Sequence, residues 1–429
     1  MGAIAFARRM RGRLRVHILA ILFLAWAGAE SRAIEKLIRV PIHTDYGITD
    51  PAFTNSISSL LRGPLVGGNQ IKELLNGGNI FPEMLRAITN AQTSITFENF
   101  IWRSGHVSDR FIEALTERAR AGVKVHCIID GFGAFALDHK DQKRLTDAGV
   151  QLRVFNRIHF WNPTKWNHRT HRKTLVVDGK IGFIGGICLA DEWDGNAQSV
   201  DVWRDTEYRV EGPVVAQIQG LFMDNWVRTS SEVLHGPAYF PPLLPAGDIV
   251  AQAFKSGPQD GAENARFLYL YSIASARKSI RLCHSYMVPD NLAIQMLVEA
   301  ARRGVKIEII TPGVIDKNVV RRAARSRWRE MMEAGIEFWE YQPAKLHNKV
   351  MIVDDLWVTC GSINFDDRSF RINDEGNINV YDATFAKRQI EVFEQDKAQS
   401  VHIEPAKFKK RPMHERFYEN LCALFRGLL

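Results

Sequence analysis

The sequence predicts an α/β fold built from two related halves, and three observations support this prediction. Segments 171–178 and 347–354 share the pattern H-x-K-x-x-x-x-D, and each is followed after six residues by a small-residue turn. Both motifs stand at the end of a longer internal repeat. Within each copy, short apolar runs alternate with helical patterns that end at glycine, which is typical of a central sheet covered by helices.

The expected elements follow the same order in both halves. The H-x-K segments should continue as strands, since their apolar runs are rich in β-branched residues. Strand, helix, buried strand and H-x-K strand are expected at 91–95, 111–120, 121–130 and 174–177, and again at 276–280, 291–302, 303–310 and 350–353.

A proline-rich stretch separates the halves. Three prolines within five residues, Pro241, Pro242 and Pro245, favour an ordered connector. The predicted division is 1–29 as a leader, 30–69 as an N-terminal segment, 70–240 as the first domain, 241–248 as the connector and 249–429 as the second domain.

The leader combines five arginines, between Arg8 and Arg15, with an apolar run over 16–29. This pattern indicates an export signal, and an uncleaved membrane anchor is the alternative. The run is 14 residues long, shorter than the ~20 residues that span a bilayer.

The charge of the remaining chain is modest. Removing the five leader arginines lowers the formal net charge from +8 to +3, which argues against a nucleic-acid cradle. The five cysteines include no C-x-x-C pair, so no disulfide framework is expected.

The paired motifs predict phosphodiester chemistry. If the halves pack as a pseudo-twofold pair, His171 and His347 face one cleft with Lys173 and Lys349 beside them. One imidazole can attack phosphorus and form a phosphohistidine while the other protonates the leaving alcohol. The lysines and turn amides supply the charge stabilisation, so no metal or other cofactor is needed. A zinc site is not expected, because His168 and His171 would point to opposite faces of an extended segment.

Each histidine needs a carboxylate on its other ring nitrogen. The segments 205–207 and 373–375 place acids downstream of the two motifs, and Glu207 and Glu375 are the candidates. Asp178 and Asp354, the motif aspartates, are expected to brace strand ends.

These motifs resemble the phospholipase D superfamily, which is defined by a duplicated H-x-K-x-x-x-x-D pattern. Within it the chain looks most like bacterial cardiolipin synthases. The features that carry this resemblance run from about residue 70 to the end and are 74–78, 130–133, 171–173, 185–186, 203–205, 211–213 and 364–370.

The resemblance implies two tandem phospholipase D-type domains, each a mixed sheet flanked by helices, sharing one active site. It implies transfer of a phosphatidyl group to phosphatidylglycerol, with His171 usually taken as the nucleophile and His347 as the general acid, although their symmetry leaves the order open. Gly186, Ser362 and Asn364 would then bind the substrate phosphate.

One position departs from the family pattern. Cys188 stands where the first copy expects asparagine, and a thiol is a weak hydrogen-bond donor. We expect Cys188 to pack silently and Asn364 to remain as the one such amide.

Two segments suggest contact with lipid, each with a plain alternative. The aromatic and basic insertion 157–167 could rest at a lipid headgroup layer, stack on bases or pack on its own domain. The basic cluster 407–411 and the amphipathic pattern after it could lie on an anionic membrane or dock on the second domain.

The favoured function is therefore a cardiolipin synthase-like phosphatidyltransferase. The alternatives are a phospholipid hydrolase, less readily a nuclease, and a retired lipid-binding protein, against which the intact histidines and lysines argue. The expected partners are phospholipids and an anionic membrane surface, without nucleic acid, and the site requires no oligomer. The expected location is the bacterial inner membrane, on its periplasmic side.

Overall fold

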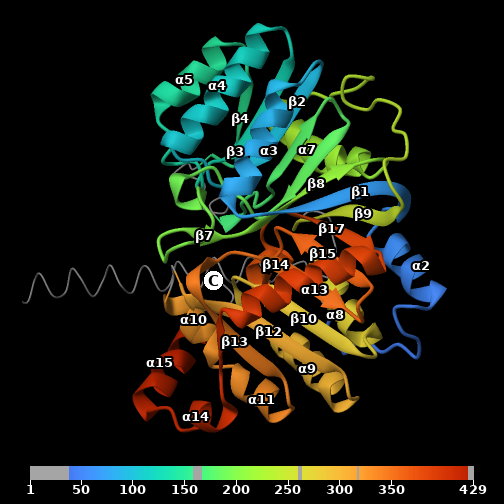
Figure 1. Cartoon of the computed structure of the whole chain (residues 1–429), viewed down its shortest axis with the longest axis vertical. Coiled ribbons are helices and arrows are strands. Elements are labelled where there is room, and N and C mark those ends of the chain that lie inside the picture. The colour runs from blue at the N-terminus through green and yellow to red at the C-terminus, as the bar shows by residue number, and fades with distance from the viewer. Residues whose placement is uncertain (1–37, 158–166, 259–262, 316–317, 424–429) are drawn as a thin grey trace, which may run out of the picture.

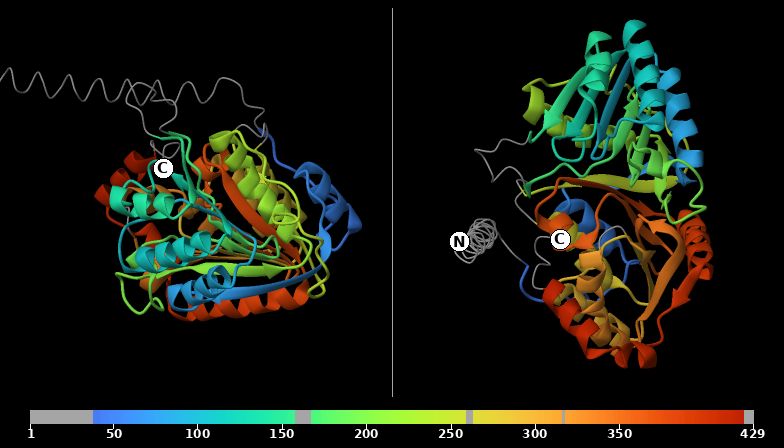
Figure 2. Two further views of the ribbon diagram at one scale, coloured as in Figure 1. Left: turned by 90° about the horizontal axis from the view of Figure 1, so that it is seen from above. Right: turned by 90° about the vertical axis from the view of Figure 1, so that its left-hand side faces the viewer.

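The computed structural model describes residues 38–157, 167–258, 263–315 and 318–423. It shows two halves that lie one above the other, with strands β1 (Val66–Leu75) and β9 (Ile249–Ser256) at their boundary (Figure 1). The right-hand view of Figure 2 shows the same two halves from the side, with the strands of each flanked by helices. The predicted leader 1–29, most of the insertion 157–167 and the last six residues of the tail fall outside the described residues.

The first half contains parallel strands followed by antiparallel ones. Strand β2 pairs with β3 in parallel and with β5 in antiparallel orientation. Helix α2 (Pro51–Leu60) precedes β1 in the chain but packs into the core of the second half. The remaining elements of the first half are α3 (Gly77–Thr89), β2 (Ser94–Asn99), α4 (His106–Arg120), β3 (Lys124–Asp130), α5 (His139–Asp147), β4 (Gln151–Phe155), β5 (Thr174–Val177), β6 (Ile181–Gly185), η1 (Asp191–Trp193), β7 (Trp203–Arg204), β8 (Thr206–Glu211) and α7 (Val215–Ser230).

The second half repeats this plan, since β10 pairs with β12 in parallel and with β14 in antiparallel orientation. Its elements after β9 are α8 (Asn264–Ser275), β10 (Ser279–His284), β11 (Met287–Val288), α9 (Asn291–Arg302), β12 (Lys306–Val314), α10 (Asn318–Arg325), α11 (Trp328–Glu333), β13 (Glu337–Leu346), β14 (Lys349–Val353), β15 (Trp357–Gly361), β16 (Phe365–Asp366), α12 (Asp367–Arg371), β17 (Glu375–Tyr381), α13 (Ala383–Ala398), β18 (Ser400–His402), α14 (Pro405–Lys409) and α15 (Met413–Ala423).

The two half-sheets are joined edge to edge. Strand β9 pairs with β17 of its own half and with β1 of the first half, so a single mixed sheet runs through both. The predicted α/β fold of two related halves is confirmed. The domain limits drawn from the sequence remain a prediction.

A shared hydrophobic core reinforces this junction. Each half has its own core, and a third cluster draws on both. In that cluster, Val176 and Tyr208 of the first half belong with Ile352 and Ile378 of the second. Burial of apolar surface therefore favours one fixed arrangement of the halves.

Both motif aspartates sit in tight turns and accept hydrogen bonds from the start of a neighbouring strand. The Asp178 carboxylate accepts from the backbone N–H groups of Gln92, Thr93 and Ser94. In the second half the Asp354 carboxylate accepts from residues 277, 278 and 279. Each aspartate thus ties the end of its H-x-K strand to the first residues of β2 or β10.

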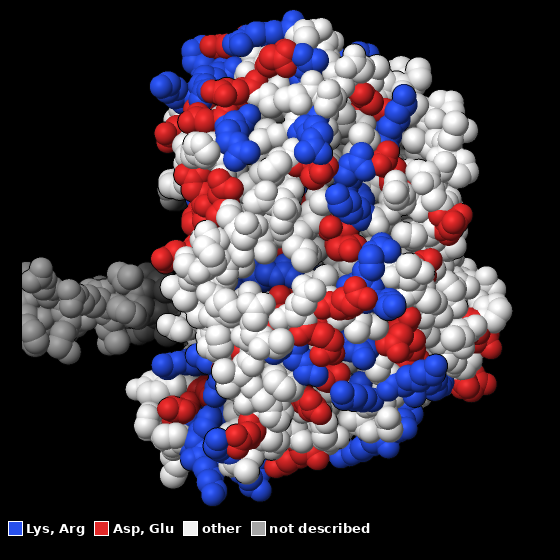
Figure 3. Space-filling model, in the orientation of Figure 1, with Lys and Arg blue, Asp and Glu red and all other residues white. Residues whose placement is uncertain are grey.

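The surface shows no broad patch of one sign on the face drawn in Figure 3, where acidic and basic side chains are interspersed. Within the described ranges, no helix is long and apolar enough to cross a membrane.

Replacing Asp178 by alanine should destabilise the fold, because three backbone N–H groups lose a charged acceptor. We expect the free energy of unfolding to fall by about 2 kcal/mol in urea denaturation. Asp147→Ala is the control, since Asp147 forms only a surface ion pair with Lys143 and should leave the midpoint unchanged. Equal effects of the two changes would contradict the bracing role.

Candidate active site

A cavity of about 730 Å³ opens between the halves, and both motif histidines line it. Its wall combines aromatic and cationic side chains from both halves. The lining residues are Phe100, Ile101, Arg103, Phe132, Gly133, Asn167, Arg169, His171, Cys188, Glu192, Trp193, Trp203, Tyr286, Val320, Lys345, His347, Asn364, Asp366, Arg368 and Asn373.

Backbone hydrogen bonds between the halves position the two histidines. The His171 N–H donates to the Asp374 carbonyl oxygen at 2.8 Å, and the His347 N–H donates to the Arg204 carbonyl oxygen at 2.7 Å. Strand β7 pairs in parallel with the end of β13 just before His347. Each H-x-K segment therefore lies beside the acidic segment of the opposite half.

This pairing gives each imidazole a carboxylate from the other half. His171 Nδ1 lies 3.0 Å from Glu375 Oε2, and His347 Nδ1 lies 2.7 Å from Asp205 Oδ2. The four side chains are nearly fully buried. Each carboxylate fixes a ring so that its Nε2 is the nitrogen left to react.

The carboxylate next to His347 is thus Asp205, where the sequence suggested Glu207. The pairing of the two halves explains this correction. His171 bonds to the Asp374 carbonyl oxygen and His347 bonds to the Arg204 carbonyl oxygen, so Arg204 corresponds to Asp374. The next residues, Asp205 and Glu375, therefore correspond as well. Glu207 lies further along, where its carboxylate accepts from the Ile187 N–H at 3.2 Å. Asn377 does the same for the Ile363 N–H at 3.1 Å, so Glu207 holds the small-residue turn.

The two lysines lie beneath the histidines. Lys173 Nζ donates to the His171 carbonyl oxygen at 2.7 Å, and Lys349 Nζ donates to the His347 carbonyl oxygen. Burial lowers the pKa of Lys173, and it lowers the pKa of Lys349 to about 8. Both ammonium groups remain a source of positive charge for a bound phosphate.

Burial also affects the pKa values of the two histidine–carboxylate pairs, and the two carboxylates respond in opposite directions. Desolvation raises the pKa of Glu375 to about 7, whereas for Asp205 the charge and hydrogen bond of His347 outweigh desolvation and bring the pKa below its usual value. Desolvation, helped by the lysines, lowers the pKa of His171 well below its usual value and that of His347 to about 4. A phosphodiester entering between the rings adds negative charge, which raises the pKa of either imidazole.

Comparison with known proteins agrees with this geometry. A family model described as cardiolipin synthase, PLD-like domain, matches residues 84–222 and 269–397. These segments make up more than half of the chain and hold one H-x-K motif each. The chain belongs to the cardiolipin synthase family of PLD-like proteins.

Curated relatives match along most of the chain, which confirms the resemblance. Probable cardiolipin synthase YwiE of Bacillus subtilis is 34% identical over 364 residues, covering 84% of this chain and 72% of that protein. Cardiolipin synthase A of Pseudomonas fluorescens is 34% identical over 337 residues, covering 78% and 70%. The crystal structure of phosphatidylserine synthase from Haemophilus influenzae has a TM-score of 0.68 at 13% identity, covers 88% of this chain and 100% of that one, and shows the fold alone.

The two halves of this PLD-like site differ in polarity. In the second half, Ser285 Oγ receives a hydrogen bond from Lys349 Nζ at 3.1 Å and lies 2.9 Å from Asn364 Oδ1. Because the amide oxygen is engaged, the Asn364 Nδ2 hydrogens are available to a phosphate oxygen. Asn364 thus remains a proposed phosphate ligand.

In the first half, Phe100 and Cys188 occupy the places of Ser285 and Asn364. The Phe100 ring lies 5.0 Å from the His171 ring and 5.1 Å from Lys173 Nζ. Cys188 is buried on the cavity wall, and desolvation raises the pKa of its thiol. This side of the site is therefore the apolar one.

Gly186 and Ser362, the other expected phosphate ligands, lie behind the carboxylates and are not among the residues that line the cavity. A Cβ at position 186 would collide with Asp205 Oδ1. Ser362 Oγ donates to Glu375 Oε2. Both residues shape the positions of the carboxylates, and direct contact with phosphate stays a prediction.

His168 Nε2 lies 2.9 Å from Asp374 Oδ1. Like the two motif histidines, His168 contacts a carboxylate from the other half of the chain.

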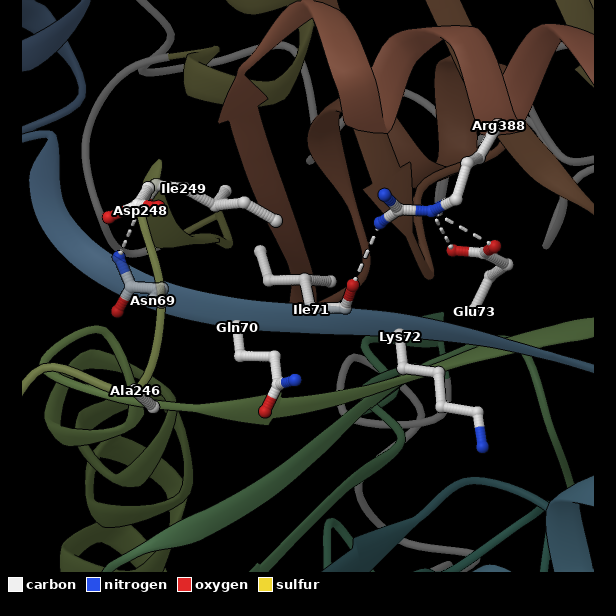
Figure 4. A pocket seen from close by; sticks show the side chains of 10 residues that line it. Asn69, Gln70, Ile71, Lys72, Glu73, Ala246, Asp248, Ile249 and Arg388 are labelled. Carbon is white, nitrogen blue, oxygen red and sulfur yellow. Dashed lines mark hydrogen bonds and ion pairs between the residues drawn. The ribbon is translucent and has the colours of Figure 1, made fainter.

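A second cavity, of about 400 Å³, lies on the boundary strand β1 and is drawn in Figure 4. There the Arg388 guanidinium of α13 points to the Glu73 carboxylate and to the Ile71 carbonyl oxygen (Figure 4). None of its ten lining residues is a histidine or cysteine. Its contacts tie the halves together, and the catalytic candidates gather in the larger cavity.

Replacing either carboxylate tests which one orients His347. Asp205→Asn keeps the shape but removes the charge that fixes the His347 tautomer, and we expect kcat for phosphodiester turnover to fall by about a thousandfold. Glu207→Gln keeps an acceptor for Ile187 and should cost about tenfold or less. A larger loss of kcat in Glu207→Gln than in Asp205→Asn, with both variants as thermally stable as the wild type, would identify Glu207 as the orienting group.

Proposed function

We propose that the protein is a phosphatidyltransferase that joins two phosphatidylglycerol molecules into cardiolipin and releases glycerol. The observation that carries this proposal is the pair of histidines, each bound to a carboxylate of the opposite half, on one cavity wall. Membership of the cardiolipin synthase family supports the choice of lipid substrate.

In the first step, His171 Nε2 attacks the phosphorus of one phosphatidylglycerol. An N–P bond forms, the bond from phosphorus to the glycerol oxygen breaks, and the protonated His347 gives its proton to that oxygen. Glycerol leaves, and a phosphatidyl group remains on His171. His347 is now neutral and hydrogen-bonded to ionised Asp205.

In the second step, a free hydroxyl of another phosphatidylglycerol enters in place of glycerol. His347 takes the hydroxyl proton as the oxygen attacks phosphorus, and the N–P bond breaks to restore His171. Lys173 and Lys349 balance the negative charge of the phosphoryl oxygens in both steps. The sum is two phosphatidylglycerols to one cardiolipin and one glycerol.

The difference between the carboxylates supports this assignment of roles. The ionised Asp205 stabilises an imidazolium at position 347, as a general acid requires. Glu375 already shares its charge with Ser362 and Ser369, so it favours a neutral, nucleophilic His171.

Vesicles of phosphatidylglycerol should yield cardiolipin and glycerol in equal amounts when incubated with the protein. His171→Ala and His347→Ala should each abolish the product, because the N–P bond or the proton donor is lost. Thin-layer chromatography and mass spectrometry of the lipids provide the measurement. Phosphatidic acid as the sole product would replace the transferase by a hydrolase, and cleavage of DNA without lipid turnover would refute the lipid substrate.

We further propose that the cavity mouth rests on an anionic lipid surface. Phe132 and Phe135, in the turns after β3, are 62% and 86% exposed, and Phe132 lines the cavity. On another side, α10 contributes Val320 to the cavity and packs against α15, whose Phe417 is 65% exposed. Exposed aromatic side chains beside a lipid-binding cavity suit insertion into the headgroup region. The leader 1–29 remains predicted as an export signal or anchor.

Phe135→Ser should reduce the fraction of protein that sediments with phosphatidylglycerol vesicles by about threefold or more, since burial of a phenylalanine side chain is worth roughly 1.5–3 kcal/mol. Phe417→Ser tests the α15 side in the same way. Leu244→Ser is the matched control, because Leu244 is 81% exposed on the connector and should leave sedimentation unchanged. Equal losses in all three variants would contradict a docking face at the cavity mouth.

A further inference from the structure

Trp193 shares a carboxylate oxygen with the second motif histidine. Its indole Nε1–H donates to Asp205 Oδ2 at 3.0 Å, and the same oxygen lies 2.7 Å from His347 Nδ1. An indole N–H can only donate. Two donors therefore converge on the single oxygen that orients and charges His347.

The Trp193 ring is held by aromatic neighbours. It stacks on Trp203 with ring centroids 4.9 Å apart, and the two rings lie edge-on to His347 at 5.6 and 5.2 Å. Only 2% of Trp193 is exposed. Its position is therefore set by packing against Trp203 and His347.

The segment 76–78, which the sequence singled out as a family feature, supports this arrangement from behind. The Asn76 N–H donates to the Asp205 carbonyl oxygen at 2.9 Å, and the Gly78 N–H donates to the Gly195 carbonyl oxygen at 2.8 Å. A Cβ at Gly77 would collide with the Trp193 carbonyl oxygen. Glycine at this position is what allows α3 to begin against Trp193.

The other half offers a different donor at the matching position. Ser369 follows Gly361 by eight residues, as Trp193 follows Gly185. The Ser369 hydroxyl donates to Glu375 Oε1 at 2.7 Å, whereas His171 contacts Glu375 Oε2. In both halves a second donor shares the oxygen that faces the histidine, Trp193 at Asp205 and Ser362 at Glu375. The donor at Asp205 is an indole, which cannot accept a hydrogen bond in return.

We propose that Trp193 is a positioning residue which, through its hydrogen bond to Asp205, makes the His347 imidazolium a stronger acid for protonating the leaving glycerol. This proposal rests on the proposed phosphatidyl transfer and assigns a role that the histidine–carboxylate pair alone does not explain.

The physical reason is the sharing of electron density on Asp205 Oδ2. An oxygen that already accepts one hydrogen bond is a weaker acceptor for a second, so it stabilises the imidazolium less. As the bond from phosphorus to the glycerol oxygen breaks, His347 Nε2 transfers its proton to that oxygen more readily. The indole proton stays on Trp193 throughout.

Trp193→Phe removes the N–H and keeps an aromatic ring against Trp203 and His347. We expect the basic limb of the pH profile of kcat to move up by about half a unit to one unit, since one hydrogen bond is worth roughly 0.5–1.5 kcal/mol and one pKa unit 1.36 kcal/mol. The plateau kcat should fall by about two- to threefold, because the acid is weaker and only part of a pKa change appears in the rate. This variant leaves the charged groups that face His347 unchanged. They are Asp205, Lys349 and Lys173, together with Lys345, which lies over the Trp203 ring.

Trp203→Phe is the matched control, since it removes an indole from the same stack without touching Asp205. The basic limb of the pH profile should stay at the same pH in this variant, even if the plateau kcat changes. Limbs that move equally in the two variants, or in neither, would overturn the proposal and leave Trp193 as a packing residue.

Titration of the His347 ring by NMR, in protein with isotope-labelled histidine, separates this proposal from the reaction itself. The signal is assigned by its loss in His347→Gln. A higher pKa of His347 in Trp193→Phe than in the wild type supports the proposal without any turnover. An unchanged pKa overturns it, whereas absence of cardiolipin formation by the wild type overturns the proposed function alone.

Discussion

The arrangement of the active site depends on two backbone hydrogen bonds that cross between the halves. They run from His171 N–H to the Asp374 carbonyl oxygen and from His347 N–H to the Arg204 carbonyl oxygen. Because each histidine takes its carboxylate from the segment it pairs with, neither half holds a complete histidine–carboxylate pair. The continuous sheet through β1 and β9 and the core cluster drawn from both halves keep these bonds in register.

Burial of so many charges in one place has a chemical consequence. Two lysines, two histidines and their carboxylates lie almost out of reach of solvent. Interactions among charges are stronger there than in water, and an unpaired charge is costly. A phosphodiester that enters the site meets the two lysines, and its own negative charge favours protonation of an imidazole.

The duplicated site is symmetric in backbone and asymmetric in side chains. Ser285 and Asn364 make the second half a polar cradle, whereas Phe100 and Cys188 make the first half apolar. The two carboxylates also differ, since the pKa of Asp205 is lowered and that of Glu375 is raised. A duplicated pair can in this way acquire distinct nucleophile and acid roles without changing any member of the H-x-K motifs.

The sequence by itself determined the fold class, the repeat, the family and the four motif residues, because local periodicity and motif spacing are properties of contiguous chain. It also pointed to Glu375 as a carboxylate candidate. It did not identify Asp205, and it did not reveal Ser285 or Trp193. Asp205 and Glu207 lie two residues apart on one extended segment, so their side chains point to the same face and spacing does not distinguish them.

Only the tertiary structure decided between these two acids. The decision depends on the register between strands of opposite halves, where the Arg204 carbonyl accepts from His347 and so places Asp205 beside the ring. That register is set by contacts between residues more than a hundred positions apart, which no local pattern encodes.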